Sequence, residues 1–179
     1  MDVWLVVGFG LILFLLVVAG ILAYLVWPML FGAMYQPSTE TVVQKMLELA
    51  GLTSDDTLYD LGSGDGRILF LAAQQYGAKA VGIEIDPIRY FRTKRKIERH
   101  GLEKQIQLIQ GNFFDQNLAD ATVVTIYQSQ RTNQKIKTKF LQELRPQTRI
   151  VSNRWTFEGW NPSQVDATVP LYLYQMNAL

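Results

Sequence analysis

The sequence has no cysteine and only one histidine, His100. Without thiols, disulfides, thiolate zinc sites, iron–sulfur clusters and a cysteine nucleophile are excluded. One histidine cannot build a multi-histidine metal site, so we expect no metal cofactor. The length of 179 residues suggests one domain with a short appendage, and a net charge of +1 gives no argument for or against nucleic acid.

Charge is also missing from residues 3–27, whereas all 17 lysines and arginines lie at Lys45 or later. As a helix, this segment spans roughly 37 Å, enough to cross a hydrocarbon core of about 30 Å. Trp4, Tyr24 and Trp27 lie near its ends, where aromatic rings favour the membrane interface.

Two alternatives exist for this apolar segment. A cleaved signal peptide needs a basic start and a shorter apolar stretch, but position 2 is Asp2. A buried core helix is rarely apolar on every side in so small a protein. We therefore predict a transmembrane anchor over residues 1–27 and a linker over 28–37. The bias of basic residues places the remainder on the cytoplasmic side of the bilayer.

Strands and helices alternate through the rest of the sequence. The spacing of apolar residues predicts helices at 41–50, 67–76, 87–100 and 136–144, and strands at 57–61, 79–85, 105–110, 121–127, 148–155 and 171–176. This order predicts an α/β fold over residues 38–179, a doubly wound and mostly parallel sheet with helices on both faces.

A glycine-rich loop, DLGSGDG at residues 60–66, connects a predicted strand to a predicted helix. Ligands of doubly wound sheets bind outside the carboxyl ends of the strands, where glycine allows close approach. The spacing fits neither a G-x-G-x-x-G dinucleotide fingerprint nor a phosphate loop. Its acidic residues would repel a pyrophosphate and suit a ligand with an ammonium and a sulfonium. Candidate cofactor contacts are Asp60, Gly62, Ser63, Gly64 and Gly66.

Two further strand ends carry polar residues. Glu84 ends the second predicted strand, where a carboxylate can accept both hydroxyls of a ribose. Asn112 and Phe113 follow the third, where an amide and an aromatic ring can read and cover an adenine. An amino acid, a ribose and an adenine together form S-adenosylmethionine. The alternative is that the glycines only make a tight turn and that Glu84 is a surface carboxylate.

The segments DLGSGDGRI, AVGIEIDP and GNFF resemble class I methyltransferases. From about Tyr35 to Tyr174, including RIVSNRW and GWNP, the sequence is similar to the small protein-lysine methyltransferases. That family includes the archaeal broad-specificity enzyme and mitochondrial enzymes acting on the c-subunit of ATP synthase and the adenine nucleotide translocase. The mitochondrial members also carry an N-terminal membrane-associating segment.

The resemblance implies a Rossmann-like class I fold, S-adenosylmethionine as cofactor and S-adenosylhomocysteine as product. It also implies cofactor contacts from Tyr35 and Ser38. The family's usual Thr-Pro is Ser38-Thr39 in this sequence, which keeps a hydroxyl at position 38.

Methyl transfer to lysine requires a deprotonated amine in line with the methyl carbon. The D/N-P-P-Y motif of many amine methyltransferases is replaced by Tyr127-Gln128-Ser129, which offers no strong base. We expect Tyr127, Gln128 and Asn153 to position the amine, with substrate contacts from Ser129, Arg154 and Trp155. Ordinary packing at strand ends is the alternative for these six residues.

The first hypothesis is a membrane-anchored protein-lysine methyltransferase whose protein substrate is membrane-embedded or membrane-associated. The second is a methyltransferase of RNA or of a small or lipid-like molecule, and the third is a non-catalytic cofactor-binding module. Nucleic acid is not the expected partner, although Arg89, Arg92, Lys96 and Arg99 fall on one side of the 87–100 helix. That basic side is a solvated face, a contact for anionic lipid or a contact for RNA.

Overall fold

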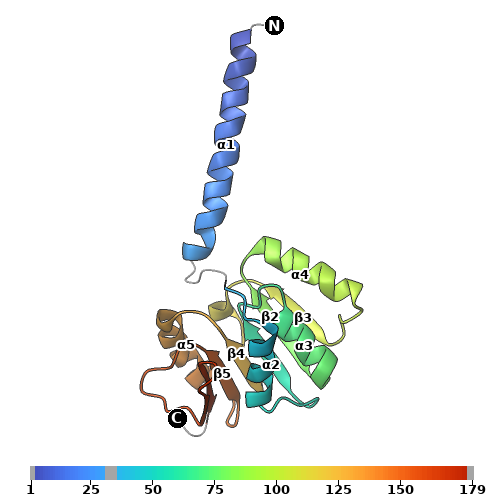
Figure 1. Ribbon diagram of the computed structural model, residues 1–179, viewed down its shortest axis with the longest axis vertical. Coiled ribbons are helices and arrows are strands. Elements are labelled where there is room, and N and C mark those ends of the chain that lie inside the picture. Colours follow the sequence, from blue (N-terminus) through green and yellow to red (C-terminus); the bar gives the residue numbers. More distant parts are fainter. Residues whose placement is uncertain (1–2, 31–35, 177–179) are drawn as a thin grey trace. The chain divides into compact units, whose positions relative to one another are not determined.

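The computed structural model describes residues 3–30 and 36–176 and divides the chain into units at residues 1–35 and 36–179 (Figure 1). Within its described residues 3–30 the first unit forms the helix α1 (Val3–Leu30), which continues beyond Trp27. Its segment Val3–Tyr24 has a mean hydropathy of 3.0 and is long and apolar enough to cross a membrane.

The second unit alternates strands and helices as the apolar spacing predicts. Its helices are α2 (Glu40–Leu49), α3 (Arg67–Tyr76), α4 (Pro87–Arg99), the 3₁₀ turn η1 (Phe113–Asp115) and α5 (Gln130–Glu143). Its strands are β1 (Thr57–Leu61), β2 (Lys79–Glu84), β3 (Ile106–Gln110), β4 (Val123–Ile126), β5 (Arg149–Asn153), β6 (Gln164–Asp166) and β7 (Leu171–Gln175).

Within the described residues the strands form one seven-stranded sheet in the order β3-β2-β1-β4-β5-β7-β6. Strands β1 to β5 are parallel, whereas β7 is antiparallel to both β5 and β6. The carboxyl ends of the five parallel strands therefore share one edge of the sheet. The strand order reverses between β1 and β4, where doubly wound sheets bind their ligands.

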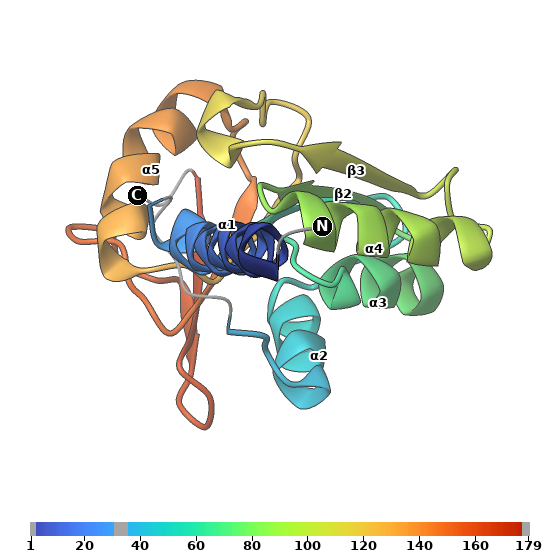
Figure 2. The same ribbon diagram turned by 90° about the horizontal axis from the view of Figure 1, so that it is seen from above.

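Helices cover both faces of this sheet (Figure 2). One apolar core packs α2 and α3 against it and includes Met46, Leu47, Leu69 and, from α4, Ile97. The core on the opposite face includes Ile136 and Phe140 of α5. The predicted doubly wound, mostly parallel α/β fold is thus confirmed.

Three features differ from the pattern prediction. Helix α5 begins at Gln130 rather than Ile136, because the Ser129 hydroxyl caps it by accepting from the Thr132 amide. Neither η1 nor β6 is predicted by apolar spacing, since each has only three residues and none of the six is buried. Apart from these differences, Phe157, which follows β5, packs in the core: it is 1% exposed, and its ring centroid lies 5.1 Å from that of Tyr174.

A buried aspartate forms an ion pair at the amino-terminal edge of the sheet. The buried Asp56 accepts hydrogen bonds from the Thr122 hydroxyl (2.7 Å) and from Arg149. Burial raises the pKa of Asp56, but bonds from Thr122 and Thr53 and the Arg149 charge outweigh it and lower that pKa overall. Arg149 also donates to the carbonyl of Ala50, which ties the end of α2 to β5.

We predict that Arg149→Gln lowers the free energy of unfolding by about 3 kcal/mol, because Asp56 is left buried without its cation. The matched control is Arg145→Gln, since Arg145 pairs with Asp120 in an exposed bridge. That change should cost less than about 1 kcal/mol. Denaturant titrations of the full chain in detergent, followed by tryptophan fluorescence, measure both values. Equal losses in the free energy of unfolding for the two variants would show that the buried Asp56–Arg149 pair stabilises the fold no more than the exposed pair does.

Candidate functional site

The loop between β1 and α3 requires glycine at several positions. Gly62, Gly64 and Gly66 have φ angles of 89°, 56° and 77°, which side-chain-bearing residues rarely adopt. A Cβ on Gly62 would lie 2.2 Å from the Gln128 side-chain nitrogen, and one on Gly66 would lie 2.7 Å from the Thr93 methyl group. The loop can therefore adopt this backbone conformation only with glycine at these positions.

Glu84, at the carboxyl end of β2, holds this loop in place. Its buried carboxylate accepts from the Gly64 amide at 2.7 Å and from the Asp86 amide at 2.8 Å. The Arg89 guanidinium lies 3.7 Å from Glu84 and from Asp86. One carboxylate thus joins two adjacent strand ends, and its remaining lone pairs are acceptors for a ligand.

Asp60 is the most perturbed acid in the site. It is 5% exposed and accepts from the Thr125 hydroxyl at 2.9 Å. Burial raises the pKa of Asp60 to about 7; the Thr125 bond opposes this rise, while the negative charges of Glu84 and Asp65 add to it. A buried carboxyl with this pKa favours a cationic partner, because a positive charge stabilises its ionised form.

One buried polar atom in the loop has no partner. The Ser63 hydroxyl makes no hydrogen bond within the described part of the chain. Unpaired buried hydroxyls are costly, and such a group at the carboxyl edge fits contact with a polar ligand. Asp60, Glu84, Ser63 and the glycine turn are thus grouped at the carboxyl edge of the sheet.

A polar chain connects the glycine loop to the segment before α2. Arg67 forms an ion pair with Asp65 at 2.5 Å and donates to the carbonyl of Ser38. The Ser38 hydroxyl in turn accepts from the Asn153 amide at 3.1 Å. The structure therefore brings together Ser38, predicted to contact the cofactor, and Asn153, predicted to position the amine.

The turn after β5 is held by a buried residue that sequence reasoning missed. Asn133 of α5 donates to the Ser152 hydroxyl at 2.9 Å and to the carbonyl of Trp155 at 3.0 Å. Between these anchors, Arg154 has a φ of 70° and its guanidinium lies 5.3 Å from the Trp155 ring. No pattern in the sequence marks Asn133, because its role depends on how α5 packs beside β5.

Three other predicted residues make local contacts. Gln128 donates to the carbonyl of Leu61 at 2.9 Å and so lies against the glycine loop. Ser129 caps α5, and the Asn112 side chain caps η1 by accepting from the Phe114 amide.

Among the remaining predicted residues, Phe113 packs against Phe114, with their ring centroids 4.8 Å apart. Tyr127 is half-buried just after β4. Tyr35 lies outside the described residues.

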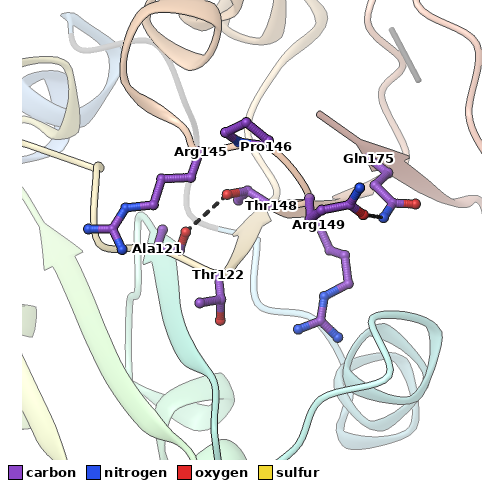
Figure 3. Close-up of a pocket in the computed structure, with 8 residues that line it drawn as sticks. Ala121, Thr122, Arg145, Pro146, Thr148, Arg149 and Gln175 are labelled. Atoms are coloured by element: carbon purple, nitrogen blue, oxygen red, sulfur yellow. Dashed lines mark hydrogen bonds between the residues drawn. The ribbon is translucent and has the colours of Figure 1, made fainter. Parts of the chain in front are cut away.

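A separate pocket of about 380 Å³ lies at the opposite edge of the sheet, where β4 and β5 begin (Figure 3). Its lining includes Thr122, Arg145, Thr148 and Arg149. Thr148 donates to the carbonyl of Ala121, and Arg145 and Arg149 are engaged in the ion pairs described above. This pocket shares no residue with the glycine loop, so we place the functional site at the carboxyl edge.

The strand order and the carboxyl-edge site are those of a class I methyltransferase, which uses S-adenosylmethionine. No group of three potential metal ligands occurs within residues 3–30 and 36–176.

Comparison with known proteins identifies a family within the class I methyltransferases. Residues 60–164 match the family described as the ANTKMT methyltransferase domain. The protein-lysine N-methyltransferase of Saccharolobus islandicus is 42% identical over 132 residues, which cover 73% of this chain and 82% of that protein. The chain belongs to this family and is an S-adenosylmethionine-dependent methyltransferase.

Two other similar proteins are named for different methyl acceptors, one a protein lysine and the other RNA. The ATP synthase c-subunit lysine N-methyltransferase of Xenopus laevis is 26% identical, with 73% of this chain matching 57% of that protein. The crystal structure of an RNA methyltransferase from Salinibacter ruber, in complex with S-adenosyl-L-homocysteine, is 38% identical, with a TM-score of 0.76. That match covers 79% of this chain and 94% of the other.

We predict that cofactor binding releases a proton below about pH 7, because a cationic amino group favours ionised Asp60. The affinity for S-adenosylhomocysteine should rise about tenfold for each pH unit from about pH 5 to about pH 7 and then level off. Calorimetry in buffers of different ionisation heat measures both effects. Asp60→Asn should flatten the profile; an unchanged slope in this variant would assign the proton elsewhere.

We also predict that Asn133→Ala lowers kcat about 10- to 100-fold, because the turn carrying Asn153 and Trp155 loses two of its hydrogen bonds. The Kd for the cofactor should change far less than kcat, since the glycine loop is untouched and this turn reaches the cofactor contact Ser38 only through Asn153. Gln142→Ala, an exposed amide on the same helix, is the control. Equal losses in kcat and in cofactor affinity would indicate a general structural role instead.

Proposed function

We propose that this chain is a membrane-anchored methyltransferase that acts on the ε-amine of lysine in a membrane-associated protein. The observation that carries the proposal is the 42% identity to a protein-lysine N-methyltransferase over 82% of that protein's length. The apolar segment Val3–Tyr24, joined to the same chain, supports the anchoring.

In this proposal the residues of the carboxyl edge divide the cofactor between them. S-adenosylmethionine, when bound, supplies a methyl group activated by a sulfonium. Asp60 receives the amino group, Glu84 accepts from the ribose, and Asn112 and Phe113 contact the adenine. Ser63 and Ser38 offer hydroxyls to the amino-acid carboxylate. Each role follows from the charge and hydrogen-bonding capacity of the side chain.

Catalysis in this proposal rests on positioning. The half-buried Tyr127 and Gln128 lie just after β4, and Asn153 ends the neighbouring β5. Their hydroxyl and amide oxygens can accept from a lysine amine and aim its lone pair. Burial beside a positive charge lowers the pKa of a lysine, so deprotonation needs no strong base. Trp155 and Arg154 flank this position and are the proposed substrate contacts.

Anchoring would place the domain on the side of the membrane that contains S-adenosylmethionine, the cytoplasmic side. A tether raises the effective concentration of targets in the same membrane. Residues 1–27 form the anchor in this proposal, 28–37 the linker and 38–179 the methyltransferase domain.

The 38% identity to the RNA methyltransferase from Salinibacter ruber favours a second candidate, methylation of RNA. The two candidates share a cofactor site and differ in the acceptor. One experiment therefore separates them, provided that it follows the label into protein and into RNA.

We predict that the full chain, reconstituted in lipid discs, transfers label from tritiated S-adenosylmethionine to protein in host membranes. The label should survive nuclease, be lost to protease and appear in acid-stable methyl-lysine. Asp60→Ala should abolish transfer, whereas Asp120→Ala, an exposed carboxylate at the opposite edge, should leave it unchanged. Label in RNA would favour the second candidate, and cofactor binding without transfer to any acceptor would indicate a non-catalytic module.

A further inference from the structure

The outer face of α4 combines exposed apolar and basic side chains. Ile88 is 42% exposed and Phe91 56% exposed. At 3.6 residues per turn they share one side of the helix with Arg92, Arg95 and Arg99. All five are exposed, and we call this set the α4 outer face.

The opposite side of α4 packs against the domain. Thr93 and Ile97 are buried there, and Thr93 donates to the carbonyl of Gly64 at 3.0 Å. Contacts with the domain also engage Arg89, 3.7 Å from Glu84 and Asp86, and Lys96, 4.2 Å from the Phe70 ring. The predicted basic side is therefore divided, with Arg89 and Lys96 committed to the domain.

The outer face itself is left with positive charge. Within the described part of the chain, no ion pair neutralises Arg92, Arg95 or Arg99. Glu98 is the one acidic residue in the sequence of α4. A partner for this face must supply negative charge and also a place where Ile88 and Phe91 can leave water.

We propose that the α4 outer face docks on an anionic lipid bilayer, with Ile88 and Phe91 entering the headgroup boundary and the arginines contacting lipid phosphates. Basic and apolar residues together on a surface helix are the composition of interfacial helices. Each basic residue near an anionic bilayer adds to the attraction.

The choice of a bilayer rests on the proposed membrane anchor. Residues 31–39 join the end of α1 to the start of α2, and a chain of that length extends at most about 30 Å. If α1 spans the bilayer, the domain stays close to its surface, and docking becomes an intramolecular step that weak contacts suffice to drive.

Docking through this face would orient the active site. Ile88 and Phe91 lie in the first turns of α4, which starts directly after the carboxyl end of β2. The apolar end of the face therefore lies at the edge of the sheet that carries Glu84 and the glycine loop. Docking there would hold that edge near the membrane and favour lysines close to the bilayer surface.

Single-cysteine labelling tests the proposal directly, because the chain has no cysteine of its own. In the Phe91→Cys variant, an environment-sensitive fluorophore is attached to the new cysteine, and the full chain is placed in lipid discs that contain a nitroxide-labelled lipid. Leu141→Cys is the matched control, since Leu141 is a 59% exposed apolar residue of α5, the helix on the opposite face of the sheet.

We expect quenching at position 91 in discs containing anionic phosphatidylglycerol, less in purely zwitterionic discs, and none at position 141. Adding Arg92→Gln and Arg95→Gln should lower the docked-to-undocked ratio about 30-fold. The proposal is overturned if position 91 is no more quenched than position 141 in anionic discs, or if the double change has no effect. It is also overturned if position 91 responds to added transfer RNA and not to lipid.

The same samples separate this proposal from the proposed function. A label at Leu13→Cys, within α1, reports insertion, and tritium transfer reports catalysis. Quenching at position 13 without quenching at position 91 would refute the docking surface and leave the anchor intact. Quenching at position 91 without quenching at position 13 would refute the anchor and leave the docking surface standing.

Discussion

A single buried carboxylate organises the active edge of this domain. Glu84 accepts the Gly64 amide from the β1–α3 loop and the Asp86 amide from the start of α4. If the loop lay elsewhere, the buried Glu84 carboxylate would lose its hydrogen bond from the Gly64 amide, a loss of roughly 1–3 kcal/mol. Because Asp86 caps α4 through the amides of Ile88 and Arg89, the same contact also fixes where that helix starts.

Close to this contact, the site brings together the two buried carboxyl groups of Asp60 and Glu84. Asp60 and Glu84 lie close enough for the charge of Glu84 to raise the pKa of Asp60, an arrangement that favours a cation beside Asp60. The sulfonium and ammonium of S-adenosylmethionine meet that requirement, whereas a pyrophosphate would worsen it. The proposed acceptor side carries the amides of Gln128 and Asn153 and, apart from Arg154, no charge, which in this proposal suits positioning of an amine rather than proton abstraction.

Sequence patterns predict most of this fold because most of its strands are apolar runs that alternate with helices of clear apolar spacing. The segments 57–61 and 67–76 coincide with β1 and α3 residue for residue. The start of α5 is not predicted, since Gln130 to Lys135 lack apolar periodicity and only the Ser129 cap defines it. The strand β6 is too short and too polar to leave a periodic signal.

For the site, sequence reasoning identifies the residues at strand ends but not their partners. The contact between Asp60 and Thr125 depends on the register of β1 and β4, which are distant in sequence. The support of the β5 turn by Asn133 and the link from Arg67 to Ser38 likewise follow from packing between helix and sheet. These contacts become visible only once the chain is folded, because no local pattern encodes them.

The central claim is that the carboxyl edge binds the adenosyl and amino-acid groups that S-adenosylmethionine and S-adenosylhomocysteine share, and titration of S-adenosylhomocysteine into the full chain tests it most directly. We predict binding of one molecule per chain, weakened about 100-fold by Glu84→Ala and unchanged by Glu158→Ala, an exposed glutamate. Equal affinity in all three proteins, or binding of NADH or ATP in place of S-adenosylhomocysteine, would contradict the account.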